Sequence, residues 1–233
     1  MYIRVPFSSI EVEINRHKRL SSSQPISEQK VFVIGLNKTG TTTLKDTLNK
    51  LGYKIGDQRV AEILAIEWAE TGDPRKIINY CYTAEAFQDL PFSKPRLYRD
   101  LHKSFPSSKF ILTHRNNAEQ WFNSLVKFHS KRFSSKPGHP PSERDLFNAC
   151  YRYKGFMLDV FKLFYNFPST PLYHKESYTS IYNNHINEVR AYFKDKPGKL
   201  LEINVAKKSD FTSLVQFLGI QTKIRTKKKK NKT

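Results

Sequence analysis

The clearest pattern of apolar residues lies between positions 31 and 52. Four consecutive apolar residues, Val31–Ile34, are followed at once by Gly35, which predicts a short buried strand that ends in a turn. Beyond the turn, leucines recur at intervals of four and three residues from Leu44 to Leu51, as on one face of a helix, and Gly52 follows as a stop signal. The predicted order is therefore strand, glycine-containing loop and helix.

Two further strands are predicted at Lys109–Thr113 and Lys199–Val205, with helices between and after them. The longer helices are expected at Glu143–Phe164 and Ser180–Phe193. Another helix follows Asn116 or Asn117, with Trp121, Leu125 and Phe128 as its apolar stripe. Strands that alternate with helices indicate a parallel α/β sheet, and ligands of such sheets bind at the carboxyl ends of the strands.

The ends of the chain differ from this central pattern. Residues 1–30 are expected to form a partly ordered extension, because Ile10, Val12 and Ile14 alternate like a strand and Ser21–Pro25 has the composition of a linker. Residues 31–221 would form a single α/β domain. Residues 222–233 are predicted to be a basic, disordered tail.

Charge is the most unusual part of the composition. The 233 residues carry a net charge of +19, and the tail contributes seven Lys/Arg and no acid, which leaves +12 for the first 221 residues. This excess suits anionic ligands and weak binding of polyanions. No zinc-finger or RNP signature is present, so a specific nucleic-acid partner is not expected.

Other features point to a cytoplasmic protein. No stretch approaches the ~20 apolar residues of a membrane span, and the first residues lack the apolar core of a signal peptide. Cys81 and Cys150 are isolated and match no metal-binding pattern, which is typical of a reducing compartment. The sequence does not indicate an oligomeric state.

The glycine-containing loop predicts an anion site without a metal. Gly35 and Gly40 have the spacing of a nucleotide-binding P-loop, but Thr41 follows where such loops carry lysine, and the lysine stands earlier, at Lys38. The strand at 109–113 ends at His114–Arg115, where a Walker-type enzyme needs a carboxylate for Mg²⁺. Backbone N–H groups and the following helix N-terminus would bind phosphate or sulfate directly.

Three sequence blocks carry a family resemblance: GLNKTGTTTL at Gly35–Leu44, DLPF at Asp89–Phe92 with LYRDLHKSFPSSKFILTHR at Leu97–Arg115, and NNAEQWFNS at Asn116–Ser124. In these blocks the chain resembles sulfotransferases that use PAPS (3′-phosphoadenylyl sulfate), in particular a small bacterial-type group with GLNKTGTT loops. The resemblance implies a P-loop-like three-layer fold. It also implies metal-independent in-line transfer of a sulfuryl group to a hydroxyl of a carbohydrate or small metabolite, with PAP (adenosine 3′,5′-bisphosphate) as product.

The resemblance also assigns site residues. The 5′-phosphosulfate would be bound by the loop residues Asn37, Lys38, Thr39, Gly40, Thr41 and Thr42. Lys38 would in addition stabilise the leaving oxygen. Arg115 and Ser124 are similar to the pair that binds the 3′-phosphate. They stand nine residues apart, where the cytosolic enzymes usually have eight, so Asn123 is the competing candidate for the second position.

Asp89 is the expected general base, because it precedes Leu-Pro where the cytosolic enzymes carry their catalytic histidine. His114 is the alternative base. Gln88 stands in place of a sulfate-binding lysine, and Thr43 replaces a tryptophan that stacks on adenine, so the adenine contact is not predicted.

Two other functions are compatible with the same loop. A nucleotide kinase would need ATP and Mg²⁺, and the absence of Gly-Lys-Ser/Thr is an argument against it. A non-catalytic protein that binds nucleotides or polyanions would use the same basic surface. Metal-independent binding of PAP excludes the kinase, and turnover distinguishes an enzyme from a binding protein.

Overall fold

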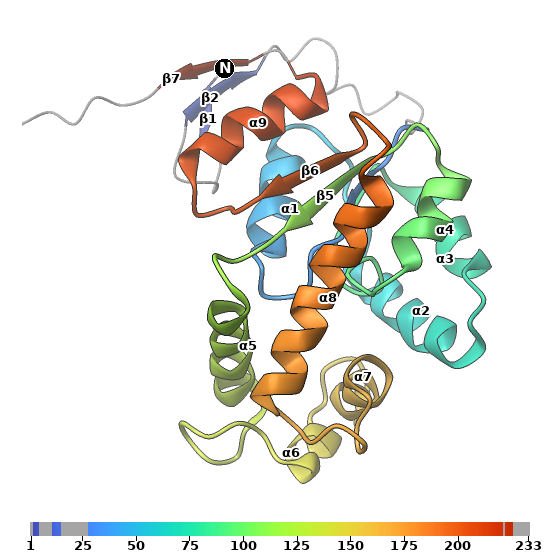
Figure 1. Cartoon of the computed structure of the whole chain (residues 1–233), viewed down its shortest axis with the longest axis vertical. Coiled ribbons are helices and arrows are strands. Elements are labelled where there is room, and N and C mark those ends of the chain that lie inside the picture. Colours follow the sequence, from blue (N-terminus) through green and yellow to red (C-terminus); the bar gives the residue numbers. More distant parts are fainter. Residues whose placement is uncertain (1, 5–10, 15–27, 221, 226–233) are drawn as a thin grey trace, which may run out of the picture.

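The computed structural model describes residues 2–4, 11–14, 28–220 and 222–225 (Figure 1). Its centre is a parallel sheet with the strand order β4-β3-β5-β6. The strands are β3 (Val31–Val33), β4 (Ala86–Phe87), β5 (Lys109–Thr113) and β6 (Leu200–Ile203). All four run in one direction, so their carboxyl ends lie at one edge of the sheet.

Helices cover both faces of this sheet. Their bounds are α1 (Thr41–Lys50), α2 (Gln58–Thr71), α3 (Arg75–Tyr80), α4 (Leu97–Ser104), α5 (Ala118–Phe133), α6 (Glu143–Asn148), α7 (Phe156–Tyr165), α8 (Lys175–Phe193) and α9 (Lys208–Leu218), with a short 3-10 helix at Cys81–Thr83.

Side chains that point alternately to the two faces of the sheet bind a layer of helices on each face, which gives three layers in all. Val31 and Val33 of β3 pack with apolar residues of α1 and α9 on one face. Phe32 points to the other face, where α2, α3, α4 and the second half of α8 contribute their apolar residues. Successive side chains of a strand point to opposite faces, so a continuous apolar run such as 31–34 is required when both faces are covered. The predicted α/β fold with a parallel central sheet is confirmed.

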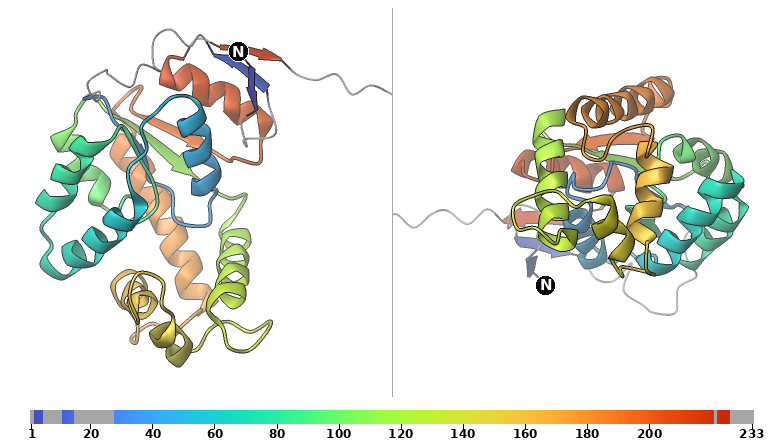
Figure 2. Two further views of the ribbon diagram at one scale, coloured as in Figure 1. Left: turned by 180° about the vertical axis from the view of Figure 1, so that it is seen from behind. Right: turned by 90° about the horizontal axis from the view of Figure 1, so that it is seen from below.

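A third apolar cluster lies beyond the carboxyl ends of the strands. It is formed by α5, α7 and the first turns of α8, with Trp121, Phe161 and Tyr178 fully buried. Figures 1 and 2 show these helices, together with α6, as a lobe that extends past the edge of the sheet. The lobe therefore lies on the side of the sheet where ligands of parallel α/β proteins bind.

One predicted helix is two helices. The segment expected as a single helix at Glu143–Phe164 divides into α6 and α7, and an irregular stretch separates them. Gly155, the N-cap of α7, has φ 93°, a left-handed conformation that interrupts a right-handed helix. The helix predicted at Ser180–Phe193 begins earlier, at Lys175.

The two ends of the chain meet in a small antiparallel sheet. Its order is β1-β2-β7, with β1 (Tyr2–Arg4), β2 (Glu11–Ile14) and β7 (Thr222–Arg225). Residues 222–225 of the predicted tail thus pair with a strand of the predicted N-terminal extension. The expected linker at Ser21–Pro25 and residues 226–233 lie outside the described residues, and the division at 30 and 221 stays a prediction. In the described part of the chain, no helix has the length and apolar character of a membrane span.

Candidate functional site

Charged side chains follow three neighbouring strands of the parallel sheet. The loop with Lys38 follows β3, Arg115 is the second residue after β5, and Asp89 is the second residue after β4. Because β3 is the middle strand of these three, its loop lies between the other two positions. The sheet topology thus gathers two positive groups and one carboxylate at its carboxyl edge.

Close packing explains both glycines of the loop. A Cβ atom at Gly35 would lie 2.2 Å from Thr113 Oγ1 and 2.3 Å from the Thr113 carbonyl oxygen, so no larger residue fits against β5. At Gly40, φ is 103° and a Cβ would lie 2.3 Å from a methyl group of Val205. Lys38 also has a left-handed backbone, with φ 66°. The loop is therefore a tight turn pressed against β5 and the segment after β6.

Three side chains from distant elements hold this loop, two through its backbone and one through the side chain of Asn37. Trp121 Nε1 of α5 donates a hydrogen bond to the carbonyl oxygen of Asn37 at 2.8 Å, and His185 Nε2 of α8 donates to that of Ile34 at 2.7 Å. The Tyr165 hydroxyl lies 3.5 Å from Asn37 Oδ1. Asn37 thus contributes to the loop mainly through contacts that hold its shape.

The threonines of the loop have different surroundings. The Thr39 hydroxyl donates to the carbonyl oxygen of Leu36 at 2.5 Å and lies 2.6 Å from the Thr113 hydroxyl, so it is used inside the protein. In this arrangement the Thr39 hydroxyl is therefore not free to bind an anion. Thr41 is buried, whereas Thr42 is exposed in the first turn of α1.

The N-terminus of α1 is open to an anion. Its N-cap, Gly40, provides no side-chain hydrogen bond, and the first turn contains no acidic residue. The first N–H groups of a helix have no partner within the helix, and they carry the positive end of its dipole. This end of α1 directly continues the loop that carries Lys38.

Lys38 is half-buried and lies against an aromatic ring. Its Nζ atom is 3.2 Å from the centroid of the Phe128 ring, which is a cation–π contact. Burial lowers the pKa of the Lys38 ammonium; the negative charge of Asp89 opposes this, and the positive charge of Arg115 adds to it. Phe128 itself is 42% exposed, so it does not belong to the buried stripe of α5 in which the sequence pattern placed it.

Arg115 is bonded directly to the loop. Its Nε donates to the carbonyl oxygen of Lys38 at 2.8 Å, and its backbone N–H donates to the Tyr182 hydroxyl at 2.9 Å. The Tyr182 ring in turn stacks on Trp121 with centroids 5.0 Å apart. Among the described residues, the terminal guanidinium nitrogens of Arg115 have no hydrogen-bond partner. Arg115 therefore joins the two predicted anion sites and keeps donors free for a ligand.

Asp89 lies in a strained, partly buried turn. Its φ is 60°, and its Oδ1 accepts a hydrogen bond from the N–H of Leu90 at 3.0 Å. Burial raises the pKa of this carboxyl, while the Leu90 N–H and the positive charge of Lys38 act in the opposite direction. Burial raises the pKa of Glu62 and of Tyr165, and the negative charge of Asp89 adds to both shifts.

Gln58 holds the residues on either side of Asp89, a role that the sequence did not suggest. Its Nε2 donates to the carbonyl oxygen of Leu90 at 3.0 Å, and its Oε1 accepts from Gln88 Nε2 at 3.0 Å. The same amide lies 3.3 Å from Glu62, whose buried carboxylate pairs with Arg152. Gln88 is thus buried, with its Nε2 bonded to Gln58, while its Oε1 has no hydrogen-bond partner among the described residues.

The remaining candidates are less well defined by contacts. Ser124 is half-buried on α5, and Asn123 is exposed on a neighbouring face of the same helix. His114, the alternative base, lies directly after the end of β5 and is half-buried. Its Nδ1 lies 2.9 Å from the carbonyl oxygen of Arg115.

Metal ligands do not gather at this edge of the sheet. Over the described ranges, no group of three or more His, Cys, Asp or Glu side chains is arranged to bind a metal ion.

A family model described as "Sulfotransferase domain" matches residues 30–223, which is most of the chain. A search of curated proteins finds no significant match.

Proposed function

Because the chain belongs to the sulfotransferase domain family, we propose that it transfers a sulfuryl group from PAPS to a hydroxyl of a carbohydrate or small metabolite. The supporting observation is the hydrogen bond from Arg115 Nε to the Lys38 carbonyl oxygen. This bond keeps the positively charged side chain of Arg115 against the loop that carries Lys38, as a nucleotide with a phosphate on each side of its ribose would require.

The residues at this edge suit PAPS. The tight turn at Gly35 and Gly40 leaves the backbone close to any anion at the start of α1. Lys38, Gly40, Thr41 and Thr42 would hold the 5′-phosphosulfate, with Asn37 and Thr39 shaping the loop. Arg115, whose terminal nitrogens are available, would hold the 3′-phosphate with Ser124.

Bound PAPS would supply the sulfuryl group and leave as PAP. The Lys38 ammonium would neutralise the charge that develops on the leaving oxygen. Asp89 would accept the proton of the acceptor hydroxyl, and its raised pKa makes it a stronger base than an exposed aspartate while it is ionised. Beyond these two groups, the protein would contribute to catalysis by orienting the two substrates.

Binding experiments separate this function from the kinase and from a non-catalytic binding protein. The protein is titrated with PAP and with ATP, in EDTA and in Mg²⁺. Our proposal predicts tight PAP binding that is unchanged by EDTA, whereas a preference for ATP with Mg²⁺ would support the kinase. Turnover of PAPS with a library of hydroxyl acceptors then shows whether this protein is an enzyme or only binds the nucleotide.

The compartment is part of the same proposal. Cys81 and Cys150 are both free thiols, which supports a location in the reducing cytoplasm. A fluorescent fusion that is excluded from the cytoplasm would contradict this location.

A further inference from the structure

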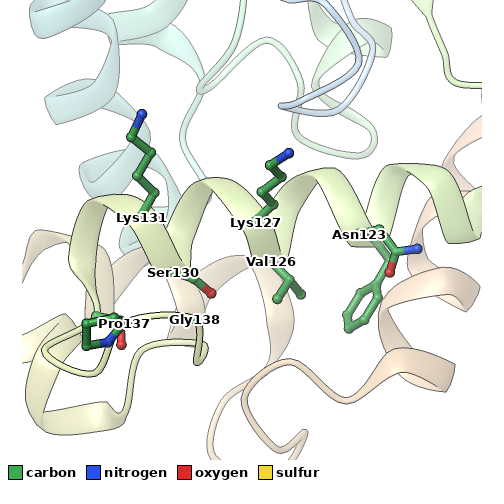
Figure 3. Close-up of a pocket in the computed structure, with 9 residues that line it drawn as sticks. Asn123, Val126, Lys127, Ser130, Lys131, Pro137 and Gly138 are labelled. Atoms are coloured by element: carbon green, nitrogen blue, oxygen red, sulfur yellow. The ribbon is translucent and has the colours of Figure 1, made fainter.

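A groove with a basic rim runs along α5, on a different face from the one that contacts Lys38. The groove has a volume of about 650 Å³ and lies between α5 and the loop around Pro137 and Gly138. Figure 3 shows Val126 and Ser130 directed toward this loop, while Lys127 and Lys131 project from the opposite edge of the helix. Phe122 and Asn123 complete the wall formed by α5.

The basic residues around this groove have no acidic partners. Residues 120–142 contain no Asp or Glu, and they include Lys127, Lys131, Arg132 and Lys136. Within the part of the chain that the structure describes, none of these four forms an ion pair. Lys175 and Arg190 on α8, by contrast, pair with Glu119 and Glu202. What distinguishes residues 120–142 is that basic side chains occur there without any acidic residue in the same stretch.

Helix stability alone does not explain this arrangement. Lys131 and Arg132 lie in the last turn of α5, where the helix dipole favours positive charge. Lys127 lies one turn earlier, and like charges four residues apart on a helix repel each other. A bound anion would reduce this repulsion, so a ligand with more than one negative charge would suit the two lysines.

The position of the groove sets the size of this ligand. Phe128, which contacts Lys38, is two residues from both Val126 and Ser130, so it points about 200° away from them around the helix. Lys131, three residues after Phe128, lies between these two faces. A molecule that reaches from the groove to Lys38 must therefore extend across roughly 10 Å, the width of a helix.

We propose that this groove binds the acidic part of an oligosaccharide acceptor, whose free hydroxyl reaches Lys38 and Asp89. The inference rests on the proposed function, and it names the acceptor class that the sequence left open. Val126 and Pro137 offer apolar surface to the C–H faces of sugar rings, Asn123 offers an amide to their hydroxyls, and the two lysines attract carboxylate or sulfate groups.

Titration calorimetry with two hexasaccharides tests the proposal. One alternates glucuronate and N-acetylglucosamine, and the other contains N-acetylglucosamine alone. The acidic hexasaccharide should bind at low salt and the neutral one at least tenfold more weakly. The variant Lys127→Ala/Lys131→Ala should weaken acidic binding by about five- to tenfold, as expected for two exposed ionic contacts.

Controls separate this site from general charge attraction. The variant Lys103→Ala/Lys194→Ala removes the same charge from exposed positions on α4 and just after α8, and it should bind the acidic hexasaccharide like the wild type. Equal losses in the two variants, no binding of the acidic hexasaccharide, or tighter binding of a hexanucleotide through the same lysines would each overturn the proposal. PAP titration of each variant reports separately on the proposed function.

Discussion

Arg115 donates a hydrogen bond from its side-chain Nε to the backbone carbonyl of Lys38, with the two atoms 2.8 Å apart. The bond joins the second residue after β5 to the loop after β3, and this loop continues into α1. It uses one of the five N–H donors of the arginine and leaves the terminal nitrogens for a ligand. Arg115 therefore lies directly against the loop that carries Lys38.

Replacing Lys38 by alanine should impair both binding and transfer. We expect about a tenfold loss of PAP affinity, because a charge-assisted contact is removed. We expect transfer to fall about 100- to 1,000-fold, since charge on the leaving oxygen is no longer stabilised. Lys50→Ala, at the other end of α1, removes the same charge and should leave both quantities near wild type. Unchanged transfer in Lys38→Ala would remove Lys38 from the mechanism.

Replacing Asp89 by asparagine should separate binding from catalysis. Asparagine tolerates the left-handed backbone at this position and can still accept the hydrogen bond of the Leu90 N–H, so PAP affinity should stay within about twofold. Transfer should slow about 100- to 10,000-fold because the base is lost. The acidic limb of the rate profile should lie at a higher pH than for an ordinary aspartate, since burial raises the pKa of Asp89. Full activity of Asp89→Asn would assign the base to another group, with His114 as the first candidate.

The same substitution should stabilise the folded protein at neutral pH. Burial raises the pKa of Asp89 in the folded protein above its pKa in the unfolded chain. At a pH above the unfolded pKa, ionisation of Asp89 therefore favours the unfolded chain over the folded protein. The variant should therefore have a higher Tm than the wild type at pH 7. The difference should shrink as pH falls below about 4, where both states are protonated. A lower Tm for the variant at pH 7 would contradict the assigned direction of the pKa shift.

Removing the hydrogen bonds of Gln58 should reduce transfer without reducing nucleotide affinity. Methionine has a similar shape but cannot bond to Leu90 or Gln88, so Gln58→Met should release the turn that holds Asp89. We expect a 10- to 100-fold lower kcat, in line with the loss caused by misplacing a reacting group. PAP affinity should stay within about twofold, and Gln216→Met, an exposed position on α9, serves as the matched control. Parallel losses of PAP binding and transfer would mean that Gln58 acts on the whole site rather than on Asp89.

Local patterns in the sequence were sufficient to predict the loop. The apolar run at 31–34, the glycines and the leucine spacing of α1 are short-range signals, and β3, the turn and α1 lie where they indicate. The sequence also placed Arg115 at the end of a strand, and the parallel sheet then brings it to the loop. Such signals suffice when the relevant residues are neighbours in the chain or at strand ends.

Contacts between distant residues were not predictable in the same way. Gln58 and Leu90 are 32 positions apart, and a glutamine at the start of a helix carries no sign of its future partner. Phe128 matches the apolar spacing of α5, yet it is 42% exposed and its ring contacts the ammonium group of Lys38. The break at Gly155 was missed because the flanking apolar spacing continues across it.

The most direct measurement compares how Arg115→Ala affects two ligands that differ only in the 3′-phosphate. Affinities for PAP and for adenosine 5′-phosphate are measured by calorimetry in EDTA, for the wild type and for the variant. If Arg115 binds the 3′-phosphate of a nucleotide whose 5′ end lies on the Lys38 loop, PAP affinity should fall about 10- to 100-fold, while that of adenosine 5′-phosphate changes less than about threefold. Equal losses for the two ligands would show that no single nucleotide is bound at its 3′-phosphate by Arg115 and at its 5′ end by the loop.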